Sequence, residues 1–139
     1  MKNGQGLGRI LIMDDERIVR ESVTRLLQIL GYTVVATRNG EEALAQFRQA
    51  DEAGTPFAAA ILDLIIDRGL GGRDTVVEMR KQNPTMPILV VSGYSNDPVM
   101  AAPKDFQFTD CIRKPFRSAL LIGKLEYHLQ QAGQMVCAS

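Results

Sequence analysis

Five short stretches of apolar residues recur along the chain, and each is too short to form a helix of ordinary length. Four are almost continuously apolar, at 9–13, 57–62, 87–91 and 109–112, and a fifth, at 32–37, is weaker and mixed with polar residues. Runs of about five residues that are apolar at successive positions are typical of strands covered on both faces. The pattern therefore predicts five strands.

Between these runs, apolar residues recur at three- and four-residue spacing, which is typical of amphipathic helices. Helices are predicted at 16–30, 40–53, 72–83 and 117–132. Gly31, Gly54 and Gly133 follow three of these segments, and glycine is favoured just after the end of a helix. Predicted strands and helices therefore alternate along the chain.

The segment between the fourth and fifth strands is less regular. Asn96 and Asp97 can cap a helix that starts at Pro98, but Pro103 comes only five residues later. Proline inside a helix removes a hydrogen bond and clashes with the preceding turn. We therefore predict that this helix is short or irregular.

Strands that alternate with helices form a parallel sheet with helices on both faces, because the crossovers are right-handed. The predicted fold class is α/β, with a doubly wound, five-stranded parallel sheet. Ligands of such sheets bind outside the carboxyl ends of the strands. The polar residues that end or follow strands there are Asp14, Asp15, Asp63, Ser92 and Lys114. We expect these five side chains to meet at one edge of the sheet.

The composition favours a single globular domain and argues against several kinds of partner. The chain has 139 residues, and its 16 Lys and Arg balance its 16 Asp and Glu, so no basic field attracts nucleic acid or an anionic membrane. No apolar run approaches the length of a membrane span and no secretory leader is evident, so a cytoplasmic location is expected. Cys111 and Cys137 lack the spacing of a metal or redox site.

Three carboxylates close together repel one another unless a cation neutralises them. Oxygen ligands with no His or Cys nearby suit Mg²⁺ or Mn²⁺. Asp63 stands alone at the end of its strand and can act as a carboxylate nucleophile toward phosphorus. Lys114 can then neutralise charge on the transferred phosphoryl group, and Ser92 can donate a hydrogen bond to it.

Each of these residues also has a simpler interpretation. Asp14 or Asp15 could cap the helix that begins near Glu16. Ser92 could be a turn residue, and Lys114 could be a solvated charge. The joint placement at successive strand ends favours the shared site.

The acidic pair at 14 and 15, the single Asp63, Ser92 and the step from Lys114 to Pro115 resemble the motif of receiver domains of two-component response regulators. The resemblance extends over nearly the whole chain, from about residue 9 to 129. It implies the strand order 2-1-3-4-5 of the flavodoxin-like receiver fold. It also implies that Asp63 is the phosphoacceptor, that Ser92 and Lys114 are the catalytic groups that bind the phosphoryl oxygens, and that a cis bond precedes Pro115.

The same resemblance implies a metal site. Asp15, Asp63 and the backbone carbonyl of Ile65 are the implied direct ligands of Mg²⁺, and Asp14 acts through water. The implied partner is a histidine kinase or a histidine phosphotransfer protein, with no contact to nucleic acid or membrane and a homodimer left open. Alone, such a domain is a self-catalysed phosphoacceptor and not a multi-turnover enzyme.

Three stretches, 63–72, 92–100 and 114–117, resemble receiver domains at the carboxyl end of hybrid sensor histidine kinases. This leaves open that the chain is a piece of such a kinase. We expect a flexible segment at 1–8, the receiver domain at 9–132 and a tail at 133–139.

Several positions depart from the common receiver pattern. Asp67 adds a fourth acid near the metal site, and Cys111 stands where many receivers carry a switching aromatic residue. Ile65 and Tyr94 flank the path of an attacking water, and they predict a slowly hydrolysing phosphoaspartate. Two alternatives remain, a receiver-like docking module that signals without phosphate and an aspartate-nucleophile phosphatase. The phosphatase family has an acid where this chain has Ile65.

Overall fold

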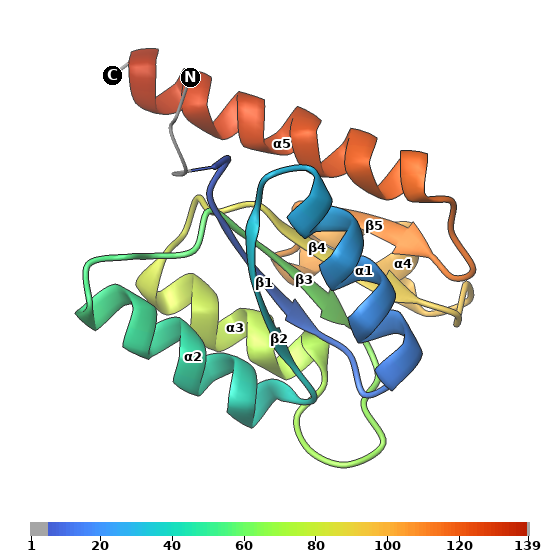
Figure 1. Ribbon diagram of the computed structural model, residues 1–139. Helices are drawn as coiled ribbons and strands as arrows, with labels where there is room; N and C mark the ends of the chain where they lie inside the picture. The colour runs from blue at the N-terminus through green and yellow to red at the C-terminus, as the bar shows by residue number, and fades with distance from the viewer. Residues whose placement is uncertain (1–5, 139) are drawn as a thin grey trace.

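The computed structural model describes residues 6–138, with side chains described up to residue 133. Its core is a parallel sheet with the strand order β2-β1-β3-β4-β5, as predicted (Figure 1). The strands are β1 (Arg9–Met13), β2 (Thr33–Thr37), β3 (Ala59–Asp63), β4 (Ile88–Ser92) and β5 (Asp110–Arg113). The helices are α1 (Arg17–Ile29), α2 (Gly40–Glu52), α3 (Gly72–Gln82), α4 (Pro98–Ala101), the 3₁₀ turn η1 (Pro103–Phe106) and α5 (Ser118–Ala138).

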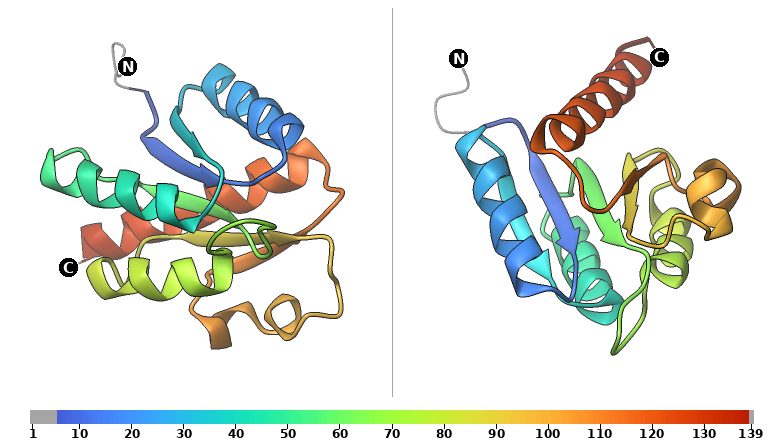
Figure 2. Two further views of the ribbon diagram at one scale, coloured as in Figure 1. Left: turned by 90° about the horizontal axis from the view of Figure 1, so that it is seen from below. Right: turned by 90° about the vertical axis from the view of Figure 1, so that its right-hand side faces the viewer.

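Helices cover both faces of the sheet and give the molecule three layers (Figures 1 and 2). α1 and α5 lie on one face, and α2, α3 and the short α4 lie on the other. Strand β1 shows why the strands read as continuous apolar runs. Ile10 and Ile12 pack in the cluster under α1 and α5, while Leu11 and Met13 pack in the cluster under α2 and α3. Alternate side chains of one strand thus enter two different cores.

Local signals set most element ends. Gly31 and Gly54 follow α1 and α2 with positive φ angles of 108° and 78°, a conformation that favours glycine. The fourth helix is short, as predicted: α4 ends at Ala101, and Pro103 begins the separate 3₁₀ turn.

The last helix differs from the prediction. The helix expected at 117–132 runs from Ser118 to Ala138, so Gly133 lies inside it and does not end it. Glycine in a helix interior is only about 1 kcal/mol less favourable than alanine, which does not break a helix whose neighbouring residues favour it. The tail expected at 133–139 is therefore helical as far as Ala138, and residue 139 lies outside the described residues.

The start of the chain is partly tied to the sheet. The Leu7 amide donates to the Gly31 carbonyl at 3.0 Å, and the Gly8 carbonyl accepts from the Thr33 amide at 2.9 Å. These bonds connect the end of the expected flexible segment to the turn before β2. Residues 1–5 of that segment lie outside the described residues. Within residues 6–138, no helix is both long and apolar enough to span a bilayer.

Candidate functional site

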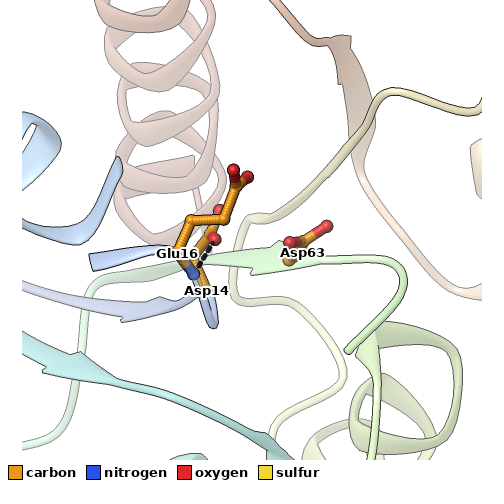
Figure 3. A group of neighbouring side chains, drawn as sticks. All are labelled: Asp14, Glu16 and Asp63. Carbon is orange, nitrogen blue, oxygen red and sulfur yellow. Dashed lines mark hydrogen bonds between the residues drawn. The ribbon is translucent and has the colours of Figure 1, made fainter. Parts of the chain in front are cut away.

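Four of the five predicted site residues stand at the carboxyl ends of β1, β3, β4 and β5. Asp63 ends β3 and Ser92 ends β4, while Asp14 follows β1 and Lys114 follows β5. Backbone bonds continue the sheet at these positions, because the Asp14 amide donates to the Thr37 carbonyl and the Lys114 amide donates to the Ser92 carbonyl. The rigid sheet therefore positions the site. Figure 3 shows Asp14 and Asp63 reaching the same side from adjacent strands.

The Lys114 ammonium lies between three carboxylates. Its Nζ is 2.9 Å from Asp14 Oδ2, 2.9 Å from Glu16 Oε1 and 3.2 Å from Asp63 Oδ2. The side chains of Asp14, Asp63 and Lys114 are only 5%, 8% and 17% exposed, whereas that of Glu16 is 62% exposed. One cation therefore pairs with two buried acids and one acid at the surface.

The buried charges change the acidity of Asp63. Burial raises its pKa to about 6, the Asp14 charge adds to the rise, and the Lys114 ammonium opposes it. Burial alone would lower the pKa of Lys114, but hydrogen bonds to Asp14 and Glu16 and the charge of Asp63 raise it above its ordinary value. Asp63 is thus a carboxylate at neutral pH, held in an environment that favours its neutral form.

The oxygens of Asp14, Glu16 and Asp63 fit a divalent cation by their chemistry. One carboxylate oxygen from each lies within 4.8 Å of the others (Figure 3). Three such anions around Lys114 show that the site favours positive charge, and oxygen donors without His or Cys suit Mg²⁺ or Mn²⁺. From the sequence, Glu16 is only the residue near which a helix begins. Its place directly after Asp14 and Asp15 is the sequence signal that could have added it to the predicted acidic cluster.

Asp15 and Ile65, two of the implied metal ligands, lie near this cluster but are not part of it. Asp15 Oδ2 accepts a hydrogen bond of 3.0 Å from the Asp67 amide, so its carboxylate faces the loop after β3. Both residues line a surface pocket of about 480 Å³, together with Asp63 and Tyr94. The pocket gives solvent and small solutes a route to Asp63.

The simpler interpretations fare differently: α1 has Glu16 at its N-cap position and no side-chain cap, so neither Asp14 nor Asp15 caps it. Asp14 Oδ1 accepts from the Glu16 amide at 2.9 Å, so Asp14 stabilises the chain just before α1 as well as pairing with Lys114. Ser92 Oγ accepts from the Tyr94 amide at 2.9 Å, which makes Ser92 a turn residue here. Lys114 is not a solvated charge, because its side chain is only 17% exposed and its ammonium pairs with Asp14 and Asp63.

Comparisons with known proteins identify the family. A model of the response regulator receiver domain matches residues 10–126. The chain belongs to the receiver domain family. It is 32% identical over 123 residues to the response regulator MprA of Mycobacterium ulcerans, covering 88% of this chain and 50% of that one. It is 29% identical over 127 residues to the regulatory protein VanRB of Enterococcus faecalis, covering 91% of this chain and 54% of that one. This receiver therefore spans about half the length of these curated relatives.

Solved structures agree with this family. The receiver domain of NtrX from Brucella abortus is 28% identical with a TM-score of 0.78, covering 87% of this chain and 98% of that one. A CheY-like receiver domain protein from Methanospirillum hungatei matches at a TM-score of 0.82 and 24% identity, covering 93% of this chain and 98% of that one. The second likeness supports the fold alone.

Two further features lie at the carboxyl end of β5 and in β5 itself. The Lys114-Pro115 peptide bond is cis, as the resemblance implied. Cys111 is partly buried, and its thiol donates toward the Met100 carbonyl at 3.4 Å. This contact links β5 to α4 at the position where many receivers carry an aromatic residue.

Proposed function

We propose that this receiver domain is a phosphoacceptor switch of a two-component phosphorelay, and that Asp63 takes a phosphoryl group from a phosphohistidine. The observation that carries the proposal is the buried Asp63 carboxylate, flanked by Asp14 and paired with the Lys114 ammonium at the end of a central strand. Burial and ion pairing of an acid at an accessible pocket are typical of a group that reacts. The donor is a histidine kinase or a histidine phosphotransfer protein.

In the proposed reaction, an Asp63 oxygen attacks the phosphorus of the phosphohistidine. The new bond joins oxygen to phosphorus, the bond from phosphorus to the histidine nitrogen breaks, and its electron pair stays on the imidazole. Lys114 neutralises charge on the phosphoryl oxygens, and it lies 3.2 Å from the attacking carboxylate. Mg²⁺ or Mn²⁺, when bound, supplies further charge neutralisation. The groups that would hold it are Asp14, Asp15, Asp63 and the Ile65 carbonyl.

Ser92 completes the switch in this proposal. Its hydroxyl accepts from the Tyr94 amide in the turn after β4, and its side chain is buried. Accepting this bond leaves the hydroxyl proton free to donate, and a movement of Ser92 toward a phosphoryl oxygen on Asp63 would shift the loop to which Tyr94 belongs. Phosphorylation would then bias the loop after β4 between two arrangements, because the phosphoryl contact exists in only one of them.

The phosphohistidine donor docks, in this proposal, on a groove beside the site. Glu16 and Lys114 line both the groove and the site, and the groove continues over apolar side chains of α1 and the segment before α5. Ile18 on this surface is 79% exposed. A helical domain that carries a phosphohistidine could bury Ile18 while its imidazole reaches Asp63.

The parent protein is a further part of the proposal. The resemblance of 63–72, 92–100 and 114–117 to receivers of hybrid histidine kinases supports a hybrid kinase as the parent, with this domain in the cytoplasm. Ile65 and Tyr94 line the pocket at Asp63, which supports slow hydrolysis of the phosphoaspartate because these side chains can screen water from the acyl phosphate.

The test is the intact mass of the protein after treatment with acetyl phosphate, with and without Mg²⁺. We expect one phosphoryl adduct that requires Mg²⁺, is absent in Asp63→Asn and persists in Asp51→Asn, a matched change at an exposed position of α2. If the wild-type protein gains no adduct and also fails to bind beryllofluoride, the proposal is wrong. The domain would then be a docking module that signals without phosphate.

A further inference from the structure

Glu16 makes a contact that neither the fold nor the proposed transfer explains. Its carboxylate is 2.9 Å from Lys114 Nζ, although its side chain is 62% exposed at the start of α1. Exposed ion pairs contribute little to folding stability, about 0.2–1 kcal/mol. The contact is nevertheless well placed, because the Asp14 side chain accepts from the Glu16 amide and fixes the backbone at that point (Figure 3).

Three carboxylates surround the Lys114 ammonium, which donates hydrogen bonds to Glu16 Oε1 and Asp63 Oδ2 and lies 2.9 Å from Asp14 Oδ2. An ammonium group has three N–H donors and no acceptor, and here it faces one oxygen each of Asp14, Glu16 and Asp63. A phosphoryl group on Asp63 would need at least one of these donors. Lys114 must therefore shift from its place beside Asp63 Oδ2 to reach the phosphoryl oxygens, and this shift competes with its contacts to Asp14 and Glu16.

The contact to Glu16 is the easiest to break. Asp14 is almost fully buried, so losing its ammonium partner would leave an unpaired charge inside the protein. Glu16 is exposed, and water replaces the lost partner of an exposed carboxylate at little cost. We propose that Glu16 is a positioning residue that retains the Lys114 ammonium in the unphosphorylated domain and releases it to the phosphoryl oxygens. This inference rests on the proposed function.

The inference differs from a role of Glu16 as a metal ligand, and the two roles predict opposite results. A retaining contact stabilises the unphosphorylated state, so removing it should favour phosphorylation. A lost ligand would weaken metal binding and slow phosphorylation. A third possibility is that the Glu16 charge merely repels an anionic donor without touching Lys114. Glu16→Gln removes the charge, whereas Glu16→Asp keeps the charge and shortens the side chain. Comparing the two variants separates this possibility from the first.

The experiment compares Glu16→Gln, Glu16→Asp and Glu21→Gln with the wild-type protein. Glu16→Asp keeps the charge but is one methylene too short for the 2.9 Å contact. Glu21→Gln is the matched control, since Glu21 is an exposed acid of α1 that pairs with Arg17 and not with Lys114. The rate constant for phosphorylation by acetyl phosphate at saturating Mg²⁺ is measured by intact mass, and the affinity for beryllofluoride is measured by calorimetry.

Both Glu16 variants should be phosphorylated about two- to five-fold faster than the wild-type protein, the range that corresponds to the free energy of an exposed ion pair. Their affinity for beryllofluoride should rise by a similar factor, their thermal midpoints should fall by about 4 °C at most, and the control variant should stay unchanged. A wild-type rate in Glu16→Asp would overturn the inference in favour of simple repulsion. Slower phosphorylation with weaker Mg²⁺ binding in Glu16→Gln would overturn it in favour of a ligand. A wild-type protein that gains no adduct would instead refute the proposed function.

Discussion

Replacing Asp63 with Asn should stabilise the metal-free protein at neutral pH, although the substitution removes one partner of an ion pair. Asp63 is buried, and burial together with the Asp14 charge raises its pKa to about 6 in spite of the Lys114 ammonium. Asparagine has nearly the shape of the protonated acid and no charge. The substitution therefore removes the free energy needed to ionise this carboxyl group inside the fold.

The size of the effect follows from the pKa shift. The rise is from an ordinary value of 3.8 to about 6, and one pKa unit corresponds to about 1.4 kcal/mol, so ionised Asp63 destabilises the folded state by about 3 kcal/mol. Because the folded pKa is the higher one, the folded state binds more protons than the unfolded state between these values. The free energy of unfolding of the wild-type protein should therefore fall as the pH rises through this window. Asp63→Asn should lack the part of the fall that comes from ionisation of Asp63.

The assay is urea unfolding in EDTA at pH 3.5, 5 and 7.5, for the wild-type protein, Asp63→Asn and the control Asp51→Asn. At pH 7.5 the midpoint of Asp63→Asn should be higher by about 1–2 M, given a urea slope of about 2 kcal/mol per M for a domain of this size. The difference should nearly vanish at pH 3.5. Equal or lower stability of Asp63→Asn at pH 7.5 would refute the reasoning, and so would a gain that persists undiminished at pH 3.5.

Four further substitutions test other parts of the structure. Lys114→Met leaves buried carboxylates unpaired, so it should lower the metal-free free energy of unfolding by about 3–5 kcal/mol at pH 7.5, with partial recovery in Mg²⁺; unchanged urea unfolding would contradict this. A Cβ on Gly72 would lie 2.7 Å from the Asp63 carbonyl oxygen, so Gly72→Ala should destabilise by about 1–3 kcal/mol. Gly123→Ala, with open space around it, should instead stabilise by about 0.5–1 kcal/mol, and thermal unfolding measures both. Tyr94→Ala should shorten the lifetime of the phosphoryl adduct several-fold in a mass-spectrometric decay, and an unchanged lifetime would show that Tyr94 does not screen water.

Much of the fold could be predicted because each strand enters two cores. Side chains on both faces of β1, β3 and β4 are buried, so their sequences are continuously apolar and easy to recognise. Edge strand β2 is partly exposed and gave the weakest pattern. The end of α5 was misplaced because Gly133 resembles a cap, yet a single glycine does not stop a helix whose neighbours continue it.

The site was predictable only in part, because strand ends locate backbones and not side-chain contacts. The order of strands and helices brings Asp14, Asp63 and Lys114 together whatever their rotamers are. It does not determine that Asp15 turns toward the Asp67 amide, or that Glu16 reaches Lys114. Those contacts depend on loop conformation, which the spacing of apolar residues does not encode.

The placement of like charges at strand ends also explains how a rigid domain could be sensitive to one small group. The strand residues beneath Asp14 and Asp63 are almost fully buried, so the sheet can tolerate a local charge that destabilises it by about 3 kcal/mol at neutral pH. Any cation or phosphoryl contact that rearranges Lys114 changes that free energy. A ligand shifts a two-state equilibrium only by its differential affinity for the two states. Here the difference in affinity between the two states comes from a few ion pairs. The most exposed of them, between Glu16 and Lys114, is the one that can change without disturbing the sheet.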